Sequence, residues 1–477
     1  MSRELLWGPS EGFAGSLPSQ LGKVLASNLA ERLKSVRQLG LLPFLVGGAD
    51  HSRFEHSCGA TLVCSQVMER LKTHGPVTNF DIEALMGAAL LHDIGHYPLS
   101  HATERAFLGS PLKAPTHKEI SLRLVRQACD SAGFPDQLTC AIEWLLRPEA
   151  AETLPKELGA NGFKPHTFKR QLLSGALDID RLDFVLRDAI RIGLLPWTEA
   201  DYGQFLTTLI ESLTLRGLTG VDGAEDFVLC VEEKYLGEVL RFLWLRLLLY
   251  SYVYFHEEVR ALEGTYVVVF WLLGEAIGEE GLRNEVAQAA HASCGSDEEI
   301  LGQFVAQMND QTYTKWFLEL LDSRADEMDS VVTGAKKMAQ QLRETLDDPS
   351  KWGSGFVQLP TTFRLEDVSP LYKPHLSDWH AWEPLLRAIV RSGRSLPEVP
   401  VPSIVTPLRD EDRGLLILRD DKTVYSLGSL GSTSHQFQRH FARRLNRVDF
   451  YCSKPSSSDS KAFAQLIDEV LHQYAAP

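Results

Sequence analysis

A short segment of this chain concentrates side chains that can bind a metal or move a proton. The sequence LLHDIGHYPLSH at residues 90–101 directly follows the apolar run 84–91. It contributes three imidazoles and one carboxylate, those of His92, His96, His101 and Asp93. Since such groups are costly to bury without partners, the segment is expected to hold a cation or to belong to a buried polar network. Taken alone, the His-Asp pair would also fit the end of a helix, where histidine is favoured by the helix dipole.

Three other segments carry residue types that could complete a cation site. They are HSRFEHS (51–57), ALDIDRLDFVLRD (176–188) and RLLLYSYVYFH (246–256). A His-Asp pair with a distant His before it and an Asp after it supplies two nitrogens and two carboxylates. That mixture suits Mn, Fe, Zn or Ni better than an all-oxygen Mg site.

Charge and cysteine content exclude several classes of protein. The chain has 48 Lys and Arg against 63 Asp and Glu, which gives a formal net charge of −15. An acidic surface argues against strong binding to nucleic acid or to an anionic membrane, but it leaves room for a local basic pocket that accepts a small anion. The seven cysteines are scattered and contain no CxxC pair. A reducing, cytoplasmic location is therefore expected.

No segment is expected to cross a membrane. The N-terminal residues lack the apolar stretch of a signal peptide. The most membrane-like stretch, 239–255, carries Arg241 and Arg246 and is typical of a buried helix with a polar stripe.

The elements that must position these side chains are mainly helical. Helical periodicity dominates from about residue 20 to 395, and a helix that starts at Thr78 or Asn79 is expected to direct its apolar face into the His/Asp cluster. Further helices are predicted at 118–133, 136–147, 167–194, 232–278, 297–322 and 325–346. A small hairpin is predicted within 215–233.

The composition changes near residue 396, where a proline-punctuated segment begins. Strands are predicted within 414–428 and 447–452, and an amphipathic helix within 460–475. The predicted fold is therefore mainly α, with a helical catalytic region at 1–395 and a small α+β region at 400–477.

The ordered motifs resemble those of the HD-domain phosphohydrolases, a superfamily named for its His-Asp pair. The motifs are RQLG (37–40), RFEHS (53–57), HDIGHYPLSH (92–101), PTHKE (115–119) and DIDRLDFVLRD (178–188). Within the superfamily the chain is similar to the deoxynucleoside triphosphate triphosphohydrolases, which include bacterial dGTPases and the vertebrate enzyme that combines a sterile alpha motif with an HD domain. The resemblance covers about residues 30–260, and an ordered set is far more specific than a lone His-Asp pair.

The resemblance implies a role for each matching position. The positions that match metal ligands are His56, His92, Asp93 and Asp180. Those that match phosphate-facing and catalytic residues are His96, His101, His117 and Glu104. Glu104 stands one helical turn after His101, where a carboxylate meets the imidazole as a general acid/base pair requires.

The substrate-binding positions follow from the same resemblance. Gln38 and Leu39 match residues at the deoxynucleoside, and Asp188 matches a partner of the sugar 3′-hydroxyl. Arg53, Arg181 and Arg246 match the cationic positions around the triphosphate. Arginine suits these positions because its guanidinium group binds phosphate oxygens bidentately. Aromatic positions near the 2′ carbon and the nucleoside are matched by Phe184 and Tyr254.

Simpler interpretations compete at several positions. His51 is interpreted as a loop histidine, because His56 already occupies the ligand position. Arg246 could instead pair with a structural carboxylate, and aromatics such as Phe184 and Tyr254 are usually core residues. The residues interpreted as structural or as supporting the ligands are Asp178, Asp183 and His256.

The chain also departs from the family pattern. The positions that correspond to the vertebrate enzyme's guanine-nucleotide activator site are Ala26, Glu31 and Lys34, none of which keeps the family's residue. Activation by GTP through that site is therefore not expected. Phe184 lacks the hydroxyl of the tyrosine usual at its position, which leaves the strictness of deoxyribose selection open.

The expected function is hydrolysis of deoxynucleoside triphosphates to deoxynucleoside and inorganic triphosphate. It would require one divalent transition metal (Mn, Fe, Zn or Ni), with Mg possible alongside the substrate, and the resemblance favours a homo-oligomer. One alternative is another HD-domain nucleotidase or phosphodiesterase, acting on a nucleoside monophosphate, a cyclic nucleotide or an oligonucleotide. The other is a non-catalytic nucleotide-sensing module.

Overall fold

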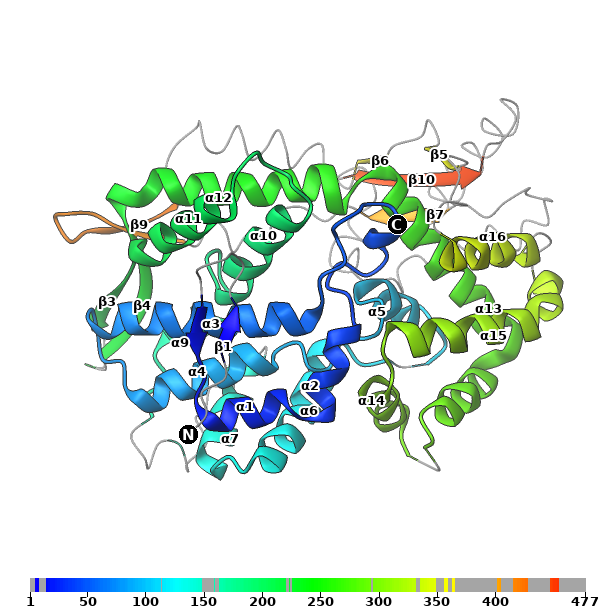
Figure 1. Ribbon diagram of the computed structural model, residues 1–477, viewed down its shortest axis with the longest axis horizontal. Coiled ribbons are helices and arrows are strands. Elements are labelled where there is room, and N and C mark those ends of the chain that lie inside the picture. The colour runs from blue at the N-terminus through cyan, green and yellow to red at the C-terminus, as the bar shows by residue number, and fades with distance from the viewer. Residues whose placement is uncertain are drawn as a thin grey trace, which may run out of the picture.

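The computed structural model describes most of the chain up to residue 348 and several shorter segments beyond it. The described residues are 5–7, 14–112, 114–147, 158, 163–219, 223, 225–292, 295–331, 335–348, 356–358, 363–364, 401–404, 415–427 and 447–453. Helices dominate these residues (Figure 1). The predicted mainly α fold is therefore confirmed.

The helices fall into two groups along the chain. The first group is α1 (Ser19–Leu25), α2 (Asn28–Arg32), α3 (Arg53–Lys72), α4 (Asn79–Leu91), α5 (His101–Leu108), α6 (His117–Ala132), α7 (Asp136–Leu146), α9 (Thr167–Gln171), α10 (Ile179–Arg191), α11 (Glu199–Ser212) and α12 (Leu236–Leu249). The second group, called the helical lobe below, is α13 (Glu257–Ala289), α14 (Asp297–Gln307), α15 (Asp310–Val331) and α16 (Ala335–Asp347). Short 3-10 turns occur at η1 (Leu33–Ser35), η2 (Leu42–Phe44) and η3 (Glu233–Tyr235), and a π-helical turn at η4 (Tyr250–Tyr254).

Three central helices of the first group position the His/Asp cluster. Helix α3 packs against α4 and α10, and α4 also packs against α7. Helix α4 is apolar on nearly every side and almost wholly buried. Thr78 caps it, as predicted, because its side chain accepts a hydrogen bond from the backbone N–H of Asp81. Since α4 ends at Leu91, the His-Asp pair lies directly at the C-terminal end of a buried helix.

The helical lobe is joined to this centre mainly through α5. Helix α13 packs against α5 on one side and against α14, α15 and α16 on the others, which places the lobe at one end of the molecule (Figure 1). By length and composition α13 could cross a membrane, but 72% of its most apolar window is buried inside the protein. Such burial is typical of a helix in the core of a protein.

Three predicted helices are wrong in their continuity. The segment predicted as one helix at 167–194 is two helices, α9 and α10, because Asp178 accepts the backbone N–H of Arg181 and starts a new helix. The predicted helix at 232–278 breaks at Phe255, where the π-helical turn ends and α13 begins. The predicted helix at 297–322 is divided at Met308, whose extended backbone ends α14.

Other predicted elements are found close to their expected bounds. The helices predicted at 118–133 and 136–147 are α6 and α7, shifted by about one residue. The helix predicted at 325–346 is displaced, since α15 continues to Val331 and α16 begins at Ala335. The predicted hairpin at 215–233 is the antiparallel pair β3 and β4.

The strands of the described residues form three small sheets. They are β1 (Leu5–Trp7), β2 (Ala14–Ser16), β3 (Leu213–Thr219), β4 (Glu225–Glu232), β5 (Phe356–Gln358), β6 (Phe363–Arg364), β7 (Val401–Ile404), β8 (Leu416–Leu418), β9 (Val424–Ser426) and β10 (Arg447–Ser453). One sheet has the order β3-β4-β8-β9, in which β8 runs parallel to β4. In a second sheet, β5, β6 and β7 all pair with β10, and the remaining pair is β1 with β2.

The strands predicted in the C-terminal region correspond to β8, β9 and β10. The helix predicted at 460–475 lies outside the described residues. The division of the chain into regions at 1–395 and 400–477 stays a prediction, although β8 joins the C-terminal part directly to the β3–β4 hairpin.

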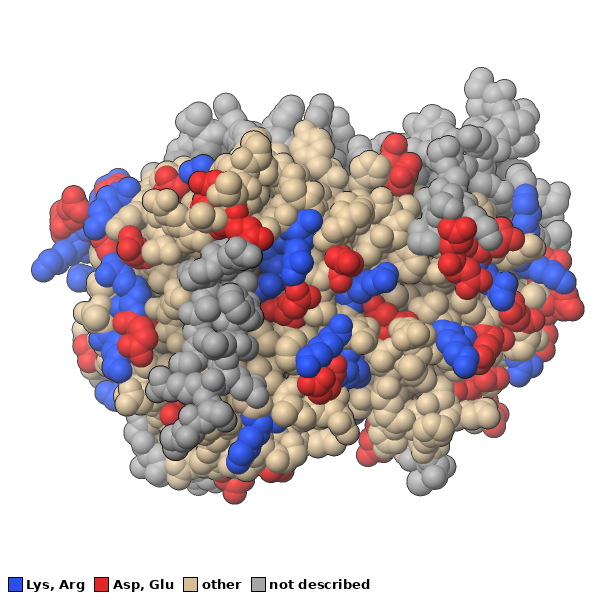
Figure 2. Space-filling model, in the orientation of Figure 1, with Lys and Arg blue, Asp and Glu red and all other residues tan. Residues whose placement is uncertain are grey.

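On the face shown in Figure 2, the basic and acidic side chains of the described residues are interspersed. This face therefore offers mixed charge to a partner.

Candidate active site

The residues predicted to bind a metal meet where α3, α4 and α10 converge. Nε2 of His56 lies 3.2 Å from Nε2 of His92 and 3.1 Å from Oδ1 of Asp180. The ligand atoms of these three residues all lie within 4.8 Å of one another. Oδ1 of Asp93 is 3.4 Å from Nε2 of His92. All four predicted ligands, His56, His92, Asp93 and Asp180, therefore reach the same small volume, and they are called the metal-type group below.

The outer hydrogen bonds of the two histidines determine which ring nitrogen faces that volume. Nδ1 of His56 is 2.8 Å from Oδ2 of Asp183, and Nδ1 of His92 is 2.8 Å from the carbonyl oxygen of Ala89. Because each acceptor requires N–H at Nδ1, the neutral form of each ring turns the lone pair of Nε2 inward. Two lone pairs at 3.2 Å repel unless a proton or a cation lies between them. The donor set therefore fits a divalent metal with mixed nitrogen and oxygen ligands.

The charges around His56 also favour a cation. Burial opposes protonation of His56, but hydrogen bonds to Asp180 and Asp183 and their charges outweigh burial and raise its pKa to about 10. Burial also disfavours the charged form of Asp180, yet the two histidines hold its pKa well below the ordinary value. A metal ion that binds here displaces such protons, so its affinity depends on pH.

A second cluster of histidines lies beside the metal-type group and is organised by one carboxylate. Oε2 of Glu104 is 2.9 Å from Nδ1 of His101, and Oε1 is 2.8 Å from both Nδ1 and the backbone N–H of His117. Burial disfavours the charged form of Glu104, but the two histidines keep its pKa well below the ordinary value. Since Nδ1 of each ring is engaged, Nε2 is the atom that remains for chemistry.

His96 completes this cluster from the loop that follows the His-Asp pair. Its ring stacks on His117 with centroids 4.1 Å apart and lies 4.8 Å from the ring of His101. Burial and the neighbouring charges of Arg53 and His117 lower the pKa of His96 well below its ordinary value. His96 is therefore neutral near pH 7, while the side chain of His101 is 58% exposed to the cavity.

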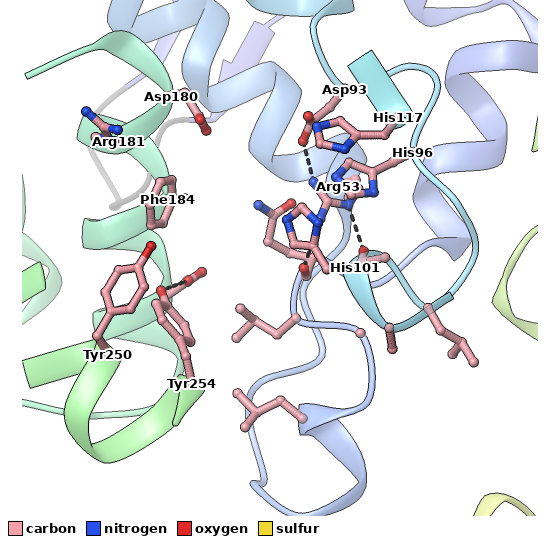
Figure 3. A pocket seen from close by; sticks show the side chains of 18 of the residues that line it. Arg53, Asp93, His96, His101, His117, Asp180, Arg181, Phe184, Tyr250 and Tyr254 are labelled. Carbon is pink, nitrogen blue, oxygen red and sulfur yellow. Dashed lines mark hydrogen bonds and ion pairs between the residues drawn. The ribbon is translucent and has the colours of Figure 1, made fainter. Parts of the chain in front are cut away.

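A cavity of about 430 Å³ extends from these two clusters. Figure 3 shows that one wall carries Arg181, Phe184, Tyr250 and Tyr254 from α10 and η4, and that His96, His101 and His117 stand on the opposite wall. Almost all of the predicted substrate and catalytic residues line this cavity. They are Gln38, Leu39, Arg53, His96, His101, His117, Arg181, Phe184, Asp188, Arg246 and Tyr254. Glu104 stands behind the two histidines to which it is bonded.

The arginines are already engaged by the protein. Arg53 bonds Asp93, donates from Nε to Oγ of Ser100 at 2.8 Å, and contacts the carbonyl oxygen of Gln38 at 3.3 Å. Arg181 is bonded to the carbonyl oxygen of Gly175. A phosphate must therefore share these guanidinium groups with the protein, which holds them in fixed orientations.

Asp188 is the centre of a buried network. Its Oδ1 is 2.7 Å from Nε2 of His51, and its Oδ2 accepts a hydrogen bond from the phenol of Tyr254. His51 is 2% exposed and lies outside the metal-type group. His51 therefore holds Asp188 in place through this contact. The interpretation of His51 as a loop histidine did not predict the contact.

Several lining residues were absent from the sequence-based set. They are Arg105, Lys118, Tyr250, Arg260 and Glu263. Three of these could have been found, since Arg105 lies one turn after His101, Lys118 follows His117, and Tyr250 lies one turn before Tyr254. Arg260 and Glu263 belong to the first turns of α13, and the sequence analysis did not place a helix start there.

The fold and this site define an HD-domain protein. Residues 53–188 match the family model of the HD domain. That range begins with Arg53 in α3, ends with Asp188 in α10, and contains all four metal-type ligands. The chain therefore contains an HD domain, as its motifs predicted.

Individual relatives extend the comparison beyond the HD domain. The chain is 25% identical over 361 residues to the uncharacterized protein YwfO of Bacillus subtilis, which covers 72% of each chain. It is 25% identical over 260 residues to the deoxynucleoside triphosphate triphosphohydrolase SAMHD1 of Bos taurus, which covers 50% of this chain and 42% of the bovine one. The chain thus spans less than half of the bovine protein.

A solved structure shows the same fold. A phosphohydrolase from Bacteroides thetaiotaomicron superposes with a TM-score of 0.63 over 95% of this chain and 100% of the other, at 19% identity. The shared architecture therefore includes the helical lobe as well as the HD domain.

Proposed function

We propose that this protein hydrolyses deoxynucleoside triphosphates to the deoxynucleoside and inorganic triphosphate. The observation that carries the proposal is the position of three groups around one cavity. The metal-type group reaches the cavity through Asp93 and Asp180. The two histidines bonded to Glu104 and the three arginines Arg53, Arg181 and Arg246 line the same cavity. A triphosphate needs positive charge along its length and a proton-transfer group at the reacting phosphorus.

The side chains have distinct parts in the reaction. Water attacks the α-phosphorus, the bond from phosphorus to O5′ breaks, and O5′ leaves with a proton. Nε2 of His101 carries a proton at a reacting oxygen, while Glu104 holds the other side of the ring at 2.9 Å. A bound divalent metal would polarise the phosphoryl group and neutralise the charge that develops on it.

The sugar end of the substrate is assigned to the cavity wall formed by α10 and η4, opposite the wall that carries the histidines. Asp188 and Tyr254 are bonded to each other and present polar groups to a hydroxyl, and Phe184 presents a ring beside them. Oε1 of Gln38 has no hydrogen-bond partner among the described residues, so its amide is available to a ligand. The relatives named as deoxynucleoside triphosphate triphosphohydrolases support this choice of substrate.

The test is a product assay with each dNTP and each NTP in the presence of Mn²⁺ and ¹⁸O-labelled water. Inorganic triphosphate that carries the label, together with unlabelled deoxynucleoside, is the expected result. Release of pyrophosphate or of monophosphate would overturn the proposal in favour of another phosphohydrolase activity. Tight nucleotide binding without turnover would favour the non-catalytic module. His92→Ala serves as the inactive control, and Asp201→Asn, at an exposed position in the first turn of α11, serves as the active one.

A further inference from the structure

Two residues directly before His101 have an unusual backbone. Leu99 and Ser100 have φ values of 53° and 54°, in the left-handed region. Residues with a side chain rarely adopt this conformation, and a bulky leucine does so only when its surroundings enforce it. The contacts around this pair therefore help to determine where His101 stands.

The side chain that holds the pair comes from the helical lobe. Oδ1 of Asp310 accepts a hydrogen bond from the backbone N–H of Leu99 at 2.7 Å, and Oδ2 accepts one from the backbone N–H of Arg37 at 2.9 Å. Oγ of Ser100 donates to the carbonyl oxygen of Arg37 at 2.6 Å. One carboxylate and one hydroxyl thus tie the segment before His101 to the segment before Gln38.

The two segments also approach each other closely at Gly40. Gly40 has φ +56°, and a Cβ atom there would lie 2.6 Å from the carbonyl oxygen of Leu99. Nε of Arg53 donates to Oγ of Ser100 at 2.8 Å. Residues 37–40 and 99–101 therefore form a single wall of the cavity, and Asp310 is bonded to both halves of it.

Asp310 does not serve its own helix. The preceding residue, Asn309, caps α15, because its Oδ1 accepts the backbone N–H of Thr312 at 3.0 Å. Both oxygens of Asp310 are thereby left for the cavity wall. Burial raises the pKa of Asp310 to about 6, although the two backbone N–H groups and the charges of Arg37 and Arg32 act in the opposite direction.

We propose that Asp310 is a positioning residue through which the helical lobe fixes His101 and Gln38 relative to Arg53. This inference rests on the proposed function for the role of His101. Loss of the carboxylate should let Leu99 and Ser100 relax towards ordinary backbone angles. This change would displace the side chain of His101 relative to Arg53 and Gln38. Because a displacement of about 1 Å can cost roughly a hundredfold in rate, the effect should appear in kcat.

The test compares Asp310→Ala with Asp310→Asn and with Tyr313→Phe. Tyr313 lies on the same helix, and its buried hydroxyl is bonded to that of Tyr266, which also bonds Thr103 on α5. Within the part of the chain that the structure describes, these hydroxyls are not bonded to residues 37–40 or 99–101. We expect Asp310→Ala to lower kcat roughly tenfold to a hundredfold with metal content and KM little changed. Asp310→Asn, which keeps one acceptor oxygen, should recover part of the loss. Tyr313→Phe should lower thermal stability but leave kcat within about twofold.

Amide hydrogen exchange provides a readout that needs no substrate. Exchange at Leu99 and Arg37 should accelerate in Asp310→Ala and remain slow in Tyr313→Phe. Full kcat in Asp310→Ala with metal bound, or unchanged exchange at both amides, would overturn the inference. If the wild-type protein releases no triphosphate, the proposed function fails, whereas the exchange result still decides whether Asp310 fixes this wall.

Discussion

Nδ1 of His56 lies 2.8 Å from Oδ2 of Asp183, and this contact turns Nε2 of His56 towards His92. Asp183 is itself fully buried and held by Arg187 through contacts of 2.9 and 2.8 Å. A metal bound between the histidines would thus depend on a carboxylate that does not touch it.

Removal of that carboxylate should weaken metal binding without abolishing it. We expect Asp183→Ala to lower the affinity for Mn²⁺ or Zn²⁺ by about ten- to a hundredfold, the usual cost of losing such a partner. His92→Ala should remove the metal altogether, since it deletes a ligand. Competition with a chelator and elemental analysis would measure both. An affinity equal to wild type in Asp183→Ala would show that the contact does not orient the ligand.

The pair formed by His101 and Glu104 should control turnover. His101→Ala and Glu104→Gln should each lower kcat by roughly two to four orders of magnitude, the range for losing general acid/base help. The metal held by His56, His92 and Asp180 should stay bound, because neither His101 nor Glu104 is among these ligands. His101 does belong to a second group, with His96 and His117, whose ligand atoms also lie within 4.8 Å of one another. Elemental analysis and steady-state kinetics on the same samples would check this. Near-full turnover in either variant would exclude the pair from proton transfer.

The pH profile should report the environment of His101. Desolvation in the cavity lowers the pKa of His101 below its ordinary value of 6.5, and the charges of His117 and Arg53 act in the same direction, while Glu104 opposes them. The limb of kcat/KM that depends on His101 should therefore lie below pH 6.5 in the free enzyme. In Glu104→Gln the opposing charge is lost, so residual activity should show this limb at a still lower pH. A limb above pH 6.5 in the wild type would contradict this description of the site.

Substrate choice should depend on Phe184 and not on Arg181. Phe184 faces the cavity on α10, and a ribose 2′-hydroxyl pressed against its ring would be buried without a partner, which costs on the order of 1–3 kcal/mol. Deoxynucleotides should therefore be favoured by roughly tenfold or more. Phe184→Ala should reduce the preference for deoxynucleotides, whereas Arg181→Ala should weaken the binding of deoxy- and ribonucleotides alike. The measurement is kcat/KM for matched dNTP and NTP pairs in the wild type and both variants. Equal wild-type values for the two sugars would show that this pocket does not select deoxyribose.

The convergence of the ligands could be predicted from the sequence because each motif lies at a helix terminus or on a short segment of fixed geometry. His92 follows a buried apolar helix, and Glu104 lies one turn after His101, so local periodicity already places them. The roles of these residues, the homo-oligomer and the cytoplasmic location stay predictions, since none of them follows from the fold of one chain.

Contacts between distant segments could not be predicted in the same way. The hydrogen bonds of His51 to Asp188 and of Asp310 to Leu99 join residues far apart in sequence, and no spacing encodes them. The break at Phe255 was missed because no glycine or proline marks the turn, although His256 and the two acidic residues after it are a helix-start signal. That single error concealed the part of the cavity wall formed by the start of α13.

The parallel pairing of β8 with β4 bears on the order in which this protein can form during synthesis on the ribosome. The hairpin of β3 and β4 is local and can close as soon as it emerges, whereas β8 is made only after the entire helical lobe. Until then the free edge of β4 presents unpaired N–H and C=O groups, which readily pair with other chains. The nascent protein therefore passes through a period in which the helical lobe has been made but one edge of this sheet is still unpaired.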